Sequence, residues 1–185
     1  MKFIIKGIVI IGLTLYPFLV GFSLANGQYL WVSALLIAFG IIRLLSNKGN
    51  DLLWPLTGFA ILCGSLSLIL KDHAWLKLYP VFMSVGAFII FATTLIKPPS
   101  MIERFARIAE PDLPPEGVVW TRKVTIVWCV FFVLNAIIAL VTVLFTSTKI
   151  WMMYNGFISY VLMGILLLGE YLLRKRQQRL HLTQK

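Results

Sequence analysis

Charged residues are scarce in this sequence, and that scarcity narrows its class at once. Only 13% of the 185 residues are charged, whereas 59% are hydrophobic. A soluble domain typically has about a quarter of its residues charged. The composition therefore excludes an ordinary soluble domain and indicates an integral membrane protein.

Motifs that carry chemistry are also missing. The sequence contains no GxSxG, HExxH or phosphate-loop motif, and Cys63 and Cys129 lie in apolar segments without a CxxC spacing. Neither cysteine pairs with a histidine at a metal-ligand spacing. Asp72 and His73 are adjacent, but no third group or nucleophile accompanies them. We therefore expect no catalytic residue, no metal site and no cofactor, and we favour a protein that is not an enzyme.

Long apolar runs are what the sequence has in abundance. A helix needs roughly 20 mostly apolar residues to cross the hydrocarbon of a bilayer. Backbone groups in lipid must be paired within the segment, and these runs lack the alternating polarity of barrel strands. The sequence predicts an all-α integral membrane protein with six transmembrane helices, at residues 7–25, 29–45, 52–70, 78–96, 124–145 and 150–173.

The distribution of basic residues predicts the orientation of these helices. With the N-terminus in the cytoplasm, fourteen of the seventeen Lys and Arg residues fall on the inner side. By the positive-inside rule we expect both termini, and the segment between helices four and five, in the cytoplasm. The net charge of +10 does not indicate a nucleic-acid partner, because the basic residues lie at helix ends, where they meet lipid headgroups.

Four regions follow from this topology. Residues 1–96 form a four-helix membrane half, residues 97–123 a cytoplasmic loop, residues 124–173 a two-helix membrane half, and residues 174–185 a basic cytoplasmic tail. Residues 1–25 also resemble a signal peptide, because a small-x-small motif ends the first apolar run. We favour retention of this segment as the first helix, since its apolar run is longer than that of a typical signal peptide.

The loop at residues 97–123 is the most distinctive segment, since it holds five of the eight prolines and four of the seven acidic residues. Ser100 and Glu103 have the spacing of a capping box, and Pro111 stops a helix. We therefore expect a short helix at residues 101–110. Its six apolar residues fit one side, as in helices that lie in the membrane interface. After this helix we expect residues 111–117, PDLPPEG, to form a stiff, extended connector.

This short amphipathic helix is the candidate partner-binding site. Two interpretations remain open: a docking surface for a cytoplasmic protein or lipid headgroup, or a cover for the inner mouth of the bundle. Glu103 and Arg107 are four residues apart and should form an ion pair. The four acidic residues of the loop offset four of its five basic residues, and this modest total charge favours a specific protein contact over attraction to anionic lipid. The candidate partner-binding residues are Glu103, Arg104, Phe105, Arg107, Trp120 and Arg122.

Polar residues inside the predicted membrane helices are the second set of candidates. Asn135 lies near the middle of the fifth helix, and we favour a hydrogen bond to another helix over a ligand site. Asn155 is placed to line an outer cavity, but close packing through Gly156 and Gly164 is the favoured interpretation. One face of the fifth helix carries residues at helical spacing: Thr125, Trp128, Phe132, Asn135, Ala139 and Thr142.

Glu170 is the only acidic residue within a predicted span, and ionisable residues in membranes are functional candidates by default. It lies near the cytoplasmic end of its helix, and Arg174 follows four residues later. We favour a local ion pair between the two over proton coupling, since charges at helix ends can reach the interface.

Two stretches of the second half carry a resemblance: PPSMIERFARIAEPDLPPEGVVWTRKVTIVWCVFFVLN and WMMYNGFISYVLMGILLLGEYLLRKR. They resemble uncharacterised bacterial inner-membrane proteins encoded beside ketosynthases, acyl carrier proteins and acyl-activating ligases, as in aryl polyene and xanthomonadin-type gene clusters. No catalytic residue carries over from that family. Its specific matches are Ile102-Glu103-Arg104, Arg107, Pro111, Leu113-Pro114, Arg122, Thr125, Trp128, Asn135, Tyr154-Asn155-Gly156 and Glu170.

A second, fold-level similarity is to bacterial septation-type inner-membrane proteins. These proteins share a Trp-x-x-Phe-Phe helix, here Trp128, Phe131 and Phe132, followed by a final span that begins with a tryptophan, here Trp151.

These observations predict a non-enzymatic, multi-pass protein of the bacterial inner membrane. The first resemblance implies that it recruits or supports components of acyl-lipid or polyene-type synthesis, with cytoplasmic acyl-carrier or acyl-transfer proteins as partners. The alternative is a small transporter or flippase for a lipid-like compound, with Asn135, Asn155 and Glu170 along its path. No internal repeat supports that alternative, and Pro17 is the only breaker in mid-span.

Overall fold

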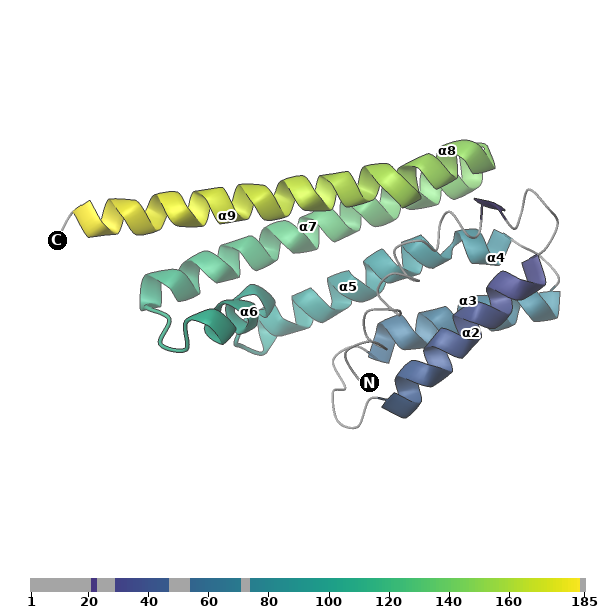
Figure 1. Cartoon of the computed structure of the whole chain (residues 1–185), viewed down its shortest axis with the longest axis horizontal. Helices are drawn as coiled ribbons and strands as arrows, with labels where there is room; N and C mark the ends of the chain where they lie inside the picture. Colours follow the sequence, from purple (N-terminus) through teal and green to yellow (C-terminus); the bar gives the residue numbers. More distant parts are fainter. Residues whose placement is uncertain (1–20, 23–28, 47–53, 71–73, 184–185) are drawn as a thin grey trace.

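The computed structural model describes residues 21–22, 29–46, 54–70 and 74–183, and the secondary structure in these ranges is helical. The helices Tyr79–Ile96, Pro115–Phe145 and Ser159–Thr183 run along one another in Figure 1, and the paired helices Tyr29–Ser46 and Trp54–Leu70 pack against the first of them. In chain order the elements are α2 (Tyr29–Ser46), α3 (Trp54–Leu70), α4 (Ala74–Lys77), α5 (Tyr79–Ile96), α6 (Met101–Ala109), α7 (Pro115–Phe145), α8 (Thr148–Met153), the π-helix η2 (Tyr154–Ile158) and α9 (Ser159–Thr183).

The predicted all-α membrane class is confirmed. Helices lie where the second to sixth spans were predicted, and the predicted first span lies outside the described residues except for Gly21 and Phe22. Within the described ranges, three helical stretches are long and apolar enough to cross a membrane: Trp75–Ile96, Pro115–Phe145 and Thr148–Lys175. Shorter apolar helices lie at Leu30–Ile42 and Gly58–Leu70.

Small residues allow α2 and α3 to pack closely. The hydroxyls of Ser33 and Ser67, both fully buried, are hydrogen bonded at 3.1 Å. A Cβ atom on Gly64 would lie 3.0 Å from the carbonyl oxygen of Ser33, so the glycine permits this approach. Leu36 of α2 belongs to the same buried core as Trp151 of α8, which ties this pair to the rest of the bundle.

α7 begins at Pro115, nine residues before the predicted start of the fifth membrane helix. Pro114 is its N-cap and Pro115 lies in its first turn, where the missing N–H costs nothing. The prediction of an extended connector at residues 111–117 is therefore wrong for residues 115–117, because these prolines start a helix. The 31 residues of α7 span about 46 Å, whereas the hydrocarbon core is about 30 Å thick. The first turns of α7 thus extend beyond the apolar layer, beside α6.

The last membrane segment contains a feature that the sequence did not predict. α8, η2 and α9 follow one another without a break, and five residues of π-helix separate the two α-helical parts. Gly156 is buried in this π-helix, but a Cβ atom on Gly164 would meet no atom within 4 Å. The predicted close packing at Gly164 is wrong, because Gly164 is exposed, whereas Met163 and Leu166 make the contacts of this part of α9 with the core.

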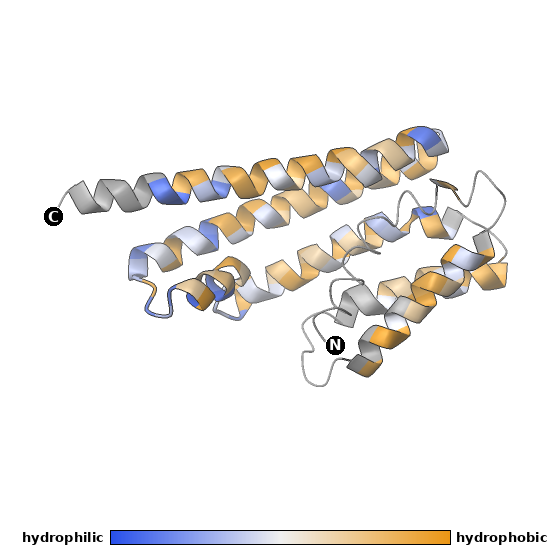
Figure 2. Cartoon of the chain, in the orientation of Figure 1, coloured by the Kyte–Doolittle hydropathy of each residue, from blue (hydrophilic) through white to orange (hydrophobic). Residues whose placement is uncertain are grey.

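Burial within α7 follows the predicted face. Every residue of that face is buried, whereas most of the large apolar residues between them, such as Val127, Leu134 and Ile138, are exposed. Figure 2 shows mainly hydrophobic residues along the middle of α5, α7 and α9, and hydrophilic ones around the turn between α6 and α7. This distribution suits a bundle whose sides face lipid and whose α6 end lies at the membrane surface.

Candidate functional site

α6 begins with the predicted capping box. Ser100, the N-cap, has an extended backbone and is 2% exposed, and its N–H donates to Oε2 of Glu103 at 3.4 Å. The helix ends at Ala109 with Glu110 as its C-cap, one residue from the predicted end. The predicted helix is thus confirmed, and the Glu103 side chain closes its first turn.

An ion pair joins the middle of α6 to its end. Arg107 donates from Nε and Nη2 to Oε1 of Glu103, at 3.0 and 2.8 Å, which confirms the predicted pair. Its Nη1 also donates to the carbonyl oxygen of Pro111 at 3.0 Å. Glu103 is buried and Arg107 is 39% exposed. Charge-assisted bonds of this kind are stronger than neutral ones, so they hold the helix and the following turn as one unit.

α6 is fixed to the rest of the bundle by three longer-range contacts. The N–H of Ile102 donates to the hydroxyl of Thr125 at 3.3 Å, and the Ile102 side chain packs with Trp128 in a buried aromatic cluster. Arg174 of α9 donates to Glu110 at 3.4 Å. The resulting platform consists of α6, the connector from Glu110 to Pro114, and the first turns of α7.

The predicted partner-binding residues all lie at this end of the molecule, in different environments. Glu103 is buried, whereas Phe105 is 55% exposed. Arg104 donates to the carbonyl oxygen of Pro99 at 2.9 Å, and Arg122 donates to that of Leu95 at 3.1 Å. Trp120 is half-buried against the aromatic cluster, and its indole N–H has no hydrogen-bond partner within the described residues.

The apolar side of α6 divides into two parts. Ile102 and Ala106 are buried against the bundle, whereas Phe105, Ile108 and Ala109 are exposed. The periodicity of the sequence placed all of them on one side, but a single neighbouring helix covers only part of that arc. A narrow apolar edge therefore remains uncovered along the platform.

Asn135 is the centre of a hydrogen-bond chain across three elements. Its Nδ2 donates to the hydroxyl of Ser84 on α5 at 2.9 Å, and its Oδ1 accepts from the hydroxyl of Tyr154 on η2 at 3.0 Å. Ser84 in turn donates to the carbonyl oxygen of Pro80. The predicted interhelical bond of Asn135 is confirmed. Its partners were not predicted, because only folding brings them from 51 and 19 residues away.

Asn155 lies in the π-helix and is 3% exposed. Its Nδ2 donates to the hydroxyl of Thr142 at 3.1 Å and to the carbonyl oxygen of Trp151 at 2.9 Å. Its Oδ1 is buried without a hydrogen-bond partner in the described structure. Asn155 thus packs α7 against the last segment, and one acceptor atom remains unused.

Glu170 does not form the predicted pair with Arg174. Arg174 binds Glu110 of the platform instead, and among the described residues Glu170 has no ion-pair partner within 4.0 Å. The sequence spacing suggested a contact along one helix, but the turn after α6 brings Glu110 to Arg174 across 64 residues.

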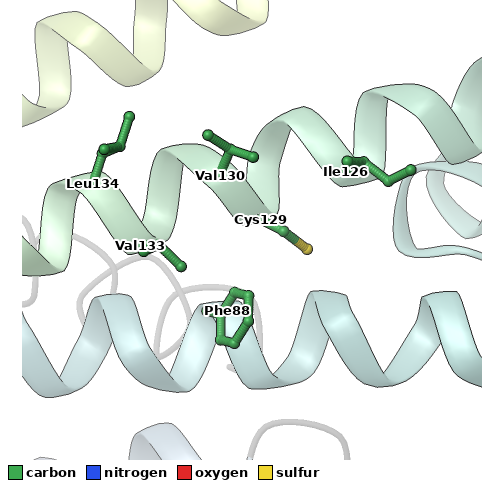
Figure 3. A pocket seen from close by; sticks show the side chains of 6 residues that line it. All are labelled: Phe88, Ile126, Cys129, Val130, Val133 and Leu134. Atoms are coloured by element: carbon green, nitrogen blue, oxygen red, sulfur yellow. The ribbon is translucent and has the colours of Figure 1, made fainter.

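A shallow depression lies between α5 and α7, with a volume of about 220 Å³ (Figure 3). Apart from the thiol of Cys129, its walls are hydrocarbon, and Phe88 faces α7 across it. Such a surface suits contact with a lipid chain better than the binding of a polar substrate. Its lining residues are Phe88, Ile126, Cys129, Val130, Val133 and Leu134.

Comparison with known proteins places the chain in a family. No significant match was found among curated proteins or solved structures. The family model described as intracellular septation protein A matches residues 1–179, which is nearly the whole sequence. The chain therefore belongs to the intracellular septation protein A family, whose members are membrane-associated proteins of cell septation.

Proposed function

We propose that this protein is a non-enzymatic scaffold of the bacterial inner membrane, which recruits cytoplasmic components of envelope lipid or acyl-chain synthesis to sites of septation. Its partners would be acyl-carrier or acyl-transfer proteins. The finer part of this proposal, the class of partner, follows from the resemblance of the second half of the chain to proteins encoded beside acyl-carrier genes.

The rigidity of the platform is the observation that carries the proposal. Glu103, Arg107 and Pro111 close α6 on itself, and contacts to Thr125 and Arg174 fix it to two long helices. A surface that is ordered before it meets a partner loses less conformational entropy on binding. The side of the platform away from the bundle offers Arg107, 39% exposed, and the exposed Asp112 of the connector.

The use of polar groups within the bundle also favours a scaffold. Asn135, Ser84 and Tyr154 bind one another, and Asn155 binds Thr142, so these groups hold helices together. The transporter alternative draws support from two unpartnered groups among the described residues, Oδ1 of Asn155 and the carboxylate of Glu170. A path for a polar headgroup needs more such groups in a row than these two provide.

Site-specific photocrosslinking tests the scaffold proposal. A photoreactive amino acid replaces Asp112 in the full chain, in inside-out membrane vesicles to which purified acyl carrier protein is added. We expect a discrete crosslinked product, reduced at least fivefold when Arg107→Ala is added. The matched control replaces Lys149, an exposed residue in the first turn of α8, and should give no product. Equal crosslinking from both positions, or none from position 112, would contradict the proposal.

A further inference from the structure

Three basic residues lie around the end of α5. They suggest a binding site that is independent of the proposed protein partner. Lys97 follows α5 directly and is exposed. Arg122 of α7 and Arg104 of α6 bind carbonyl oxygens on either side of it. We propose that Lys97, Arg104 and Arg122 form a binding site for the phosphate of an anionic phospholipid in the adjacent leaflet.

The backbone contacts bring the two guanidinium groups to the same short segment. Nη1 of Arg122 lies 3.1 Å from the carbonyl oxygen of Leu95, and Nε of Arg104 lies 2.9 Å from that of Pro99. Four residues of chain span at most about 14 Å, so the two anchor points are no farther apart than this. A guanidinium has five N–H donors. The described contacts use one donor of each, which leaves the others for phosphate oxygens.

The acidic residues of the platform do not neutralise this cluster. Glu103 is paired with Arg107, and Glu110 is paired with Arg174. Among the described residues no carboxylate lies within 4.0 Å of a nitrogen of the three cations. The loop has a low net charge in sequence, but in the fold Glu103 and Glu110 bind Arg107 and Arg174, which lie outside this cluster. An uncompensated positive cluster at the membrane surface attracts anionic headgroups.

An apolar edge beside the cations identifies the ligand as a lipid. Ile96 is 79% exposed, Phe105 55% and Ile108 81%. Ile96 ends α5, Phe105 and Ile108 lie on the exposed part of α6, and α6 meets α7 at Thr125, where the apolar part of α7 begins. Inorganic phosphate would use the cations alone, whereas a phospholipid would use the cations for its phosphate and this edge for its acyl chains.

Native mass spectrometry of the full chain in a neutral detergent tests this site by titration with lipid. We expect phosphatidylglycerol to bind at least tenfold more tightly than phosphatidylcholine. The triple variant Lys97→Gln, Arg104→Gln and Arg122→Gln should weaken phosphatidylglycerol binding by roughly a hundredfold, at about fivefold per charge. The control Lys149→Gln, which removes an exposed cation elsewhere, should leave binding unchanged.

A charge-preserving variant and a competition with inorganic phosphate separate loss of the lipid site from misfolding and from binding of soluble phosphate. The charge-preserving variant Lys97→Arg, Arg104→Lys and Arg122→Lys should retain at least a third of the affinity, and circular dichroism checks that both triple variants keep their helix content. Equal affinity for the two lipids, or wild-type affinity in the Gln variant, would overturn the proposal. Displacement of phosphatidylglycerol by millimolar inorganic phosphate would also overturn it, since the site would then be one for soluble phosphate. Crosslinking to a partner protein is a separate measurement, so either proposal can fail without the other.

Discussion

The platform at α6 and the polar cluster at Asn135 both join separate helices, but they use different chemistry. The platform uses ionised groups, with Glu103 bound to Arg107 and Arg174 bound to Glu110. The Asn135 cluster uses only an amide and two hydroxyls. An ionised group costs several kcal/mol more than a neutral one when it leaves water for a low-dielectric interior. Helices are therefore joined by ion pairs where water reaches the protein, at the α6 end, and by neutral hydrogen bonds deeper in the bundle, where it does not.

Removal of a platform carboxylate should have the largest effect on stability. Glu103→Ala deletes the partner of Arg107 and the acceptor for the N–H of Ser100, both of which are needed to close α6. We expect the free energy of unfolding to fall by about 2 kcal/mol, because hydrogen bonds to charged groups contribute about 1.5–3 kcal/mol. Denaturant unfolding in detergent micelles measures the change. Asp112→Ala, at an exposed connector position, is the control and should change stability by less than about 0.5 kcal/mol.

Loss of the Asn135 hydrogen bonds should lower the free energy of unfolding by a smaller amount, and the effects of changing Asn135 and Tyr154 should be coupled. Asn135→Leu removes the acceptor of Tyr154 and the donor to Ser84. We expect a loss of about 1 kcal/mol, since interhelical hydrogen bonds in membranes average about 0.6 kcal/mol and reach about 1.7. Tyr154→Phe should cost less in the Asn135→Leu background than in the wild-type protein, as a double-mutant cycle can measure. Additive losses would show that the two side chains do not interact.

The smallest effect is expected at Glu170. Glu170→Gln should leave the free energy of unfolding within about 0.3 kcal/mol of wild type, because no described residue pairs with it. Glu110→Gln should cost a few tenths of a kcal/mol more, since its pair with Arg174 is long and partly exposed. Unfolding in the same micelles compares the two. A larger loss at Glu170 than at Glu110 would mean that Glu170 has a structural role that the contacts do not explain.

Local features of the candidate site were predictable, because they depend on residues close in sequence. Ser100 and Glu103 specify the start of α6, and Arg107 lies one helical turn from its partner. Contacts between distant segments were not predictable in the same way. Arg174 has Glu170 four residues before it and Glu110 64 residues before it. Sequence spacing alone favours Glu170, whereas the fold pairs Arg174 with Glu110.

The sequence by itself determined the membrane class, the helices of the second to sixth spans and the capped helix between two of them. These follow from apolar length, helical periodicity and capping chemistry, which act over a few turns of chain. Only the tertiary structure decided which groups those helices bring together: Ser84 and Tyr154 to Asn135, Glu110 to Arg174, and three cations to the end of α5. The physical reason is that charge balance and polar pairing depend on distance in space. In this protein a loop of low net charge folds so that two of its acidic residues are in ion pairs, while three cations at the end of α5 are in none of the described ion pairs.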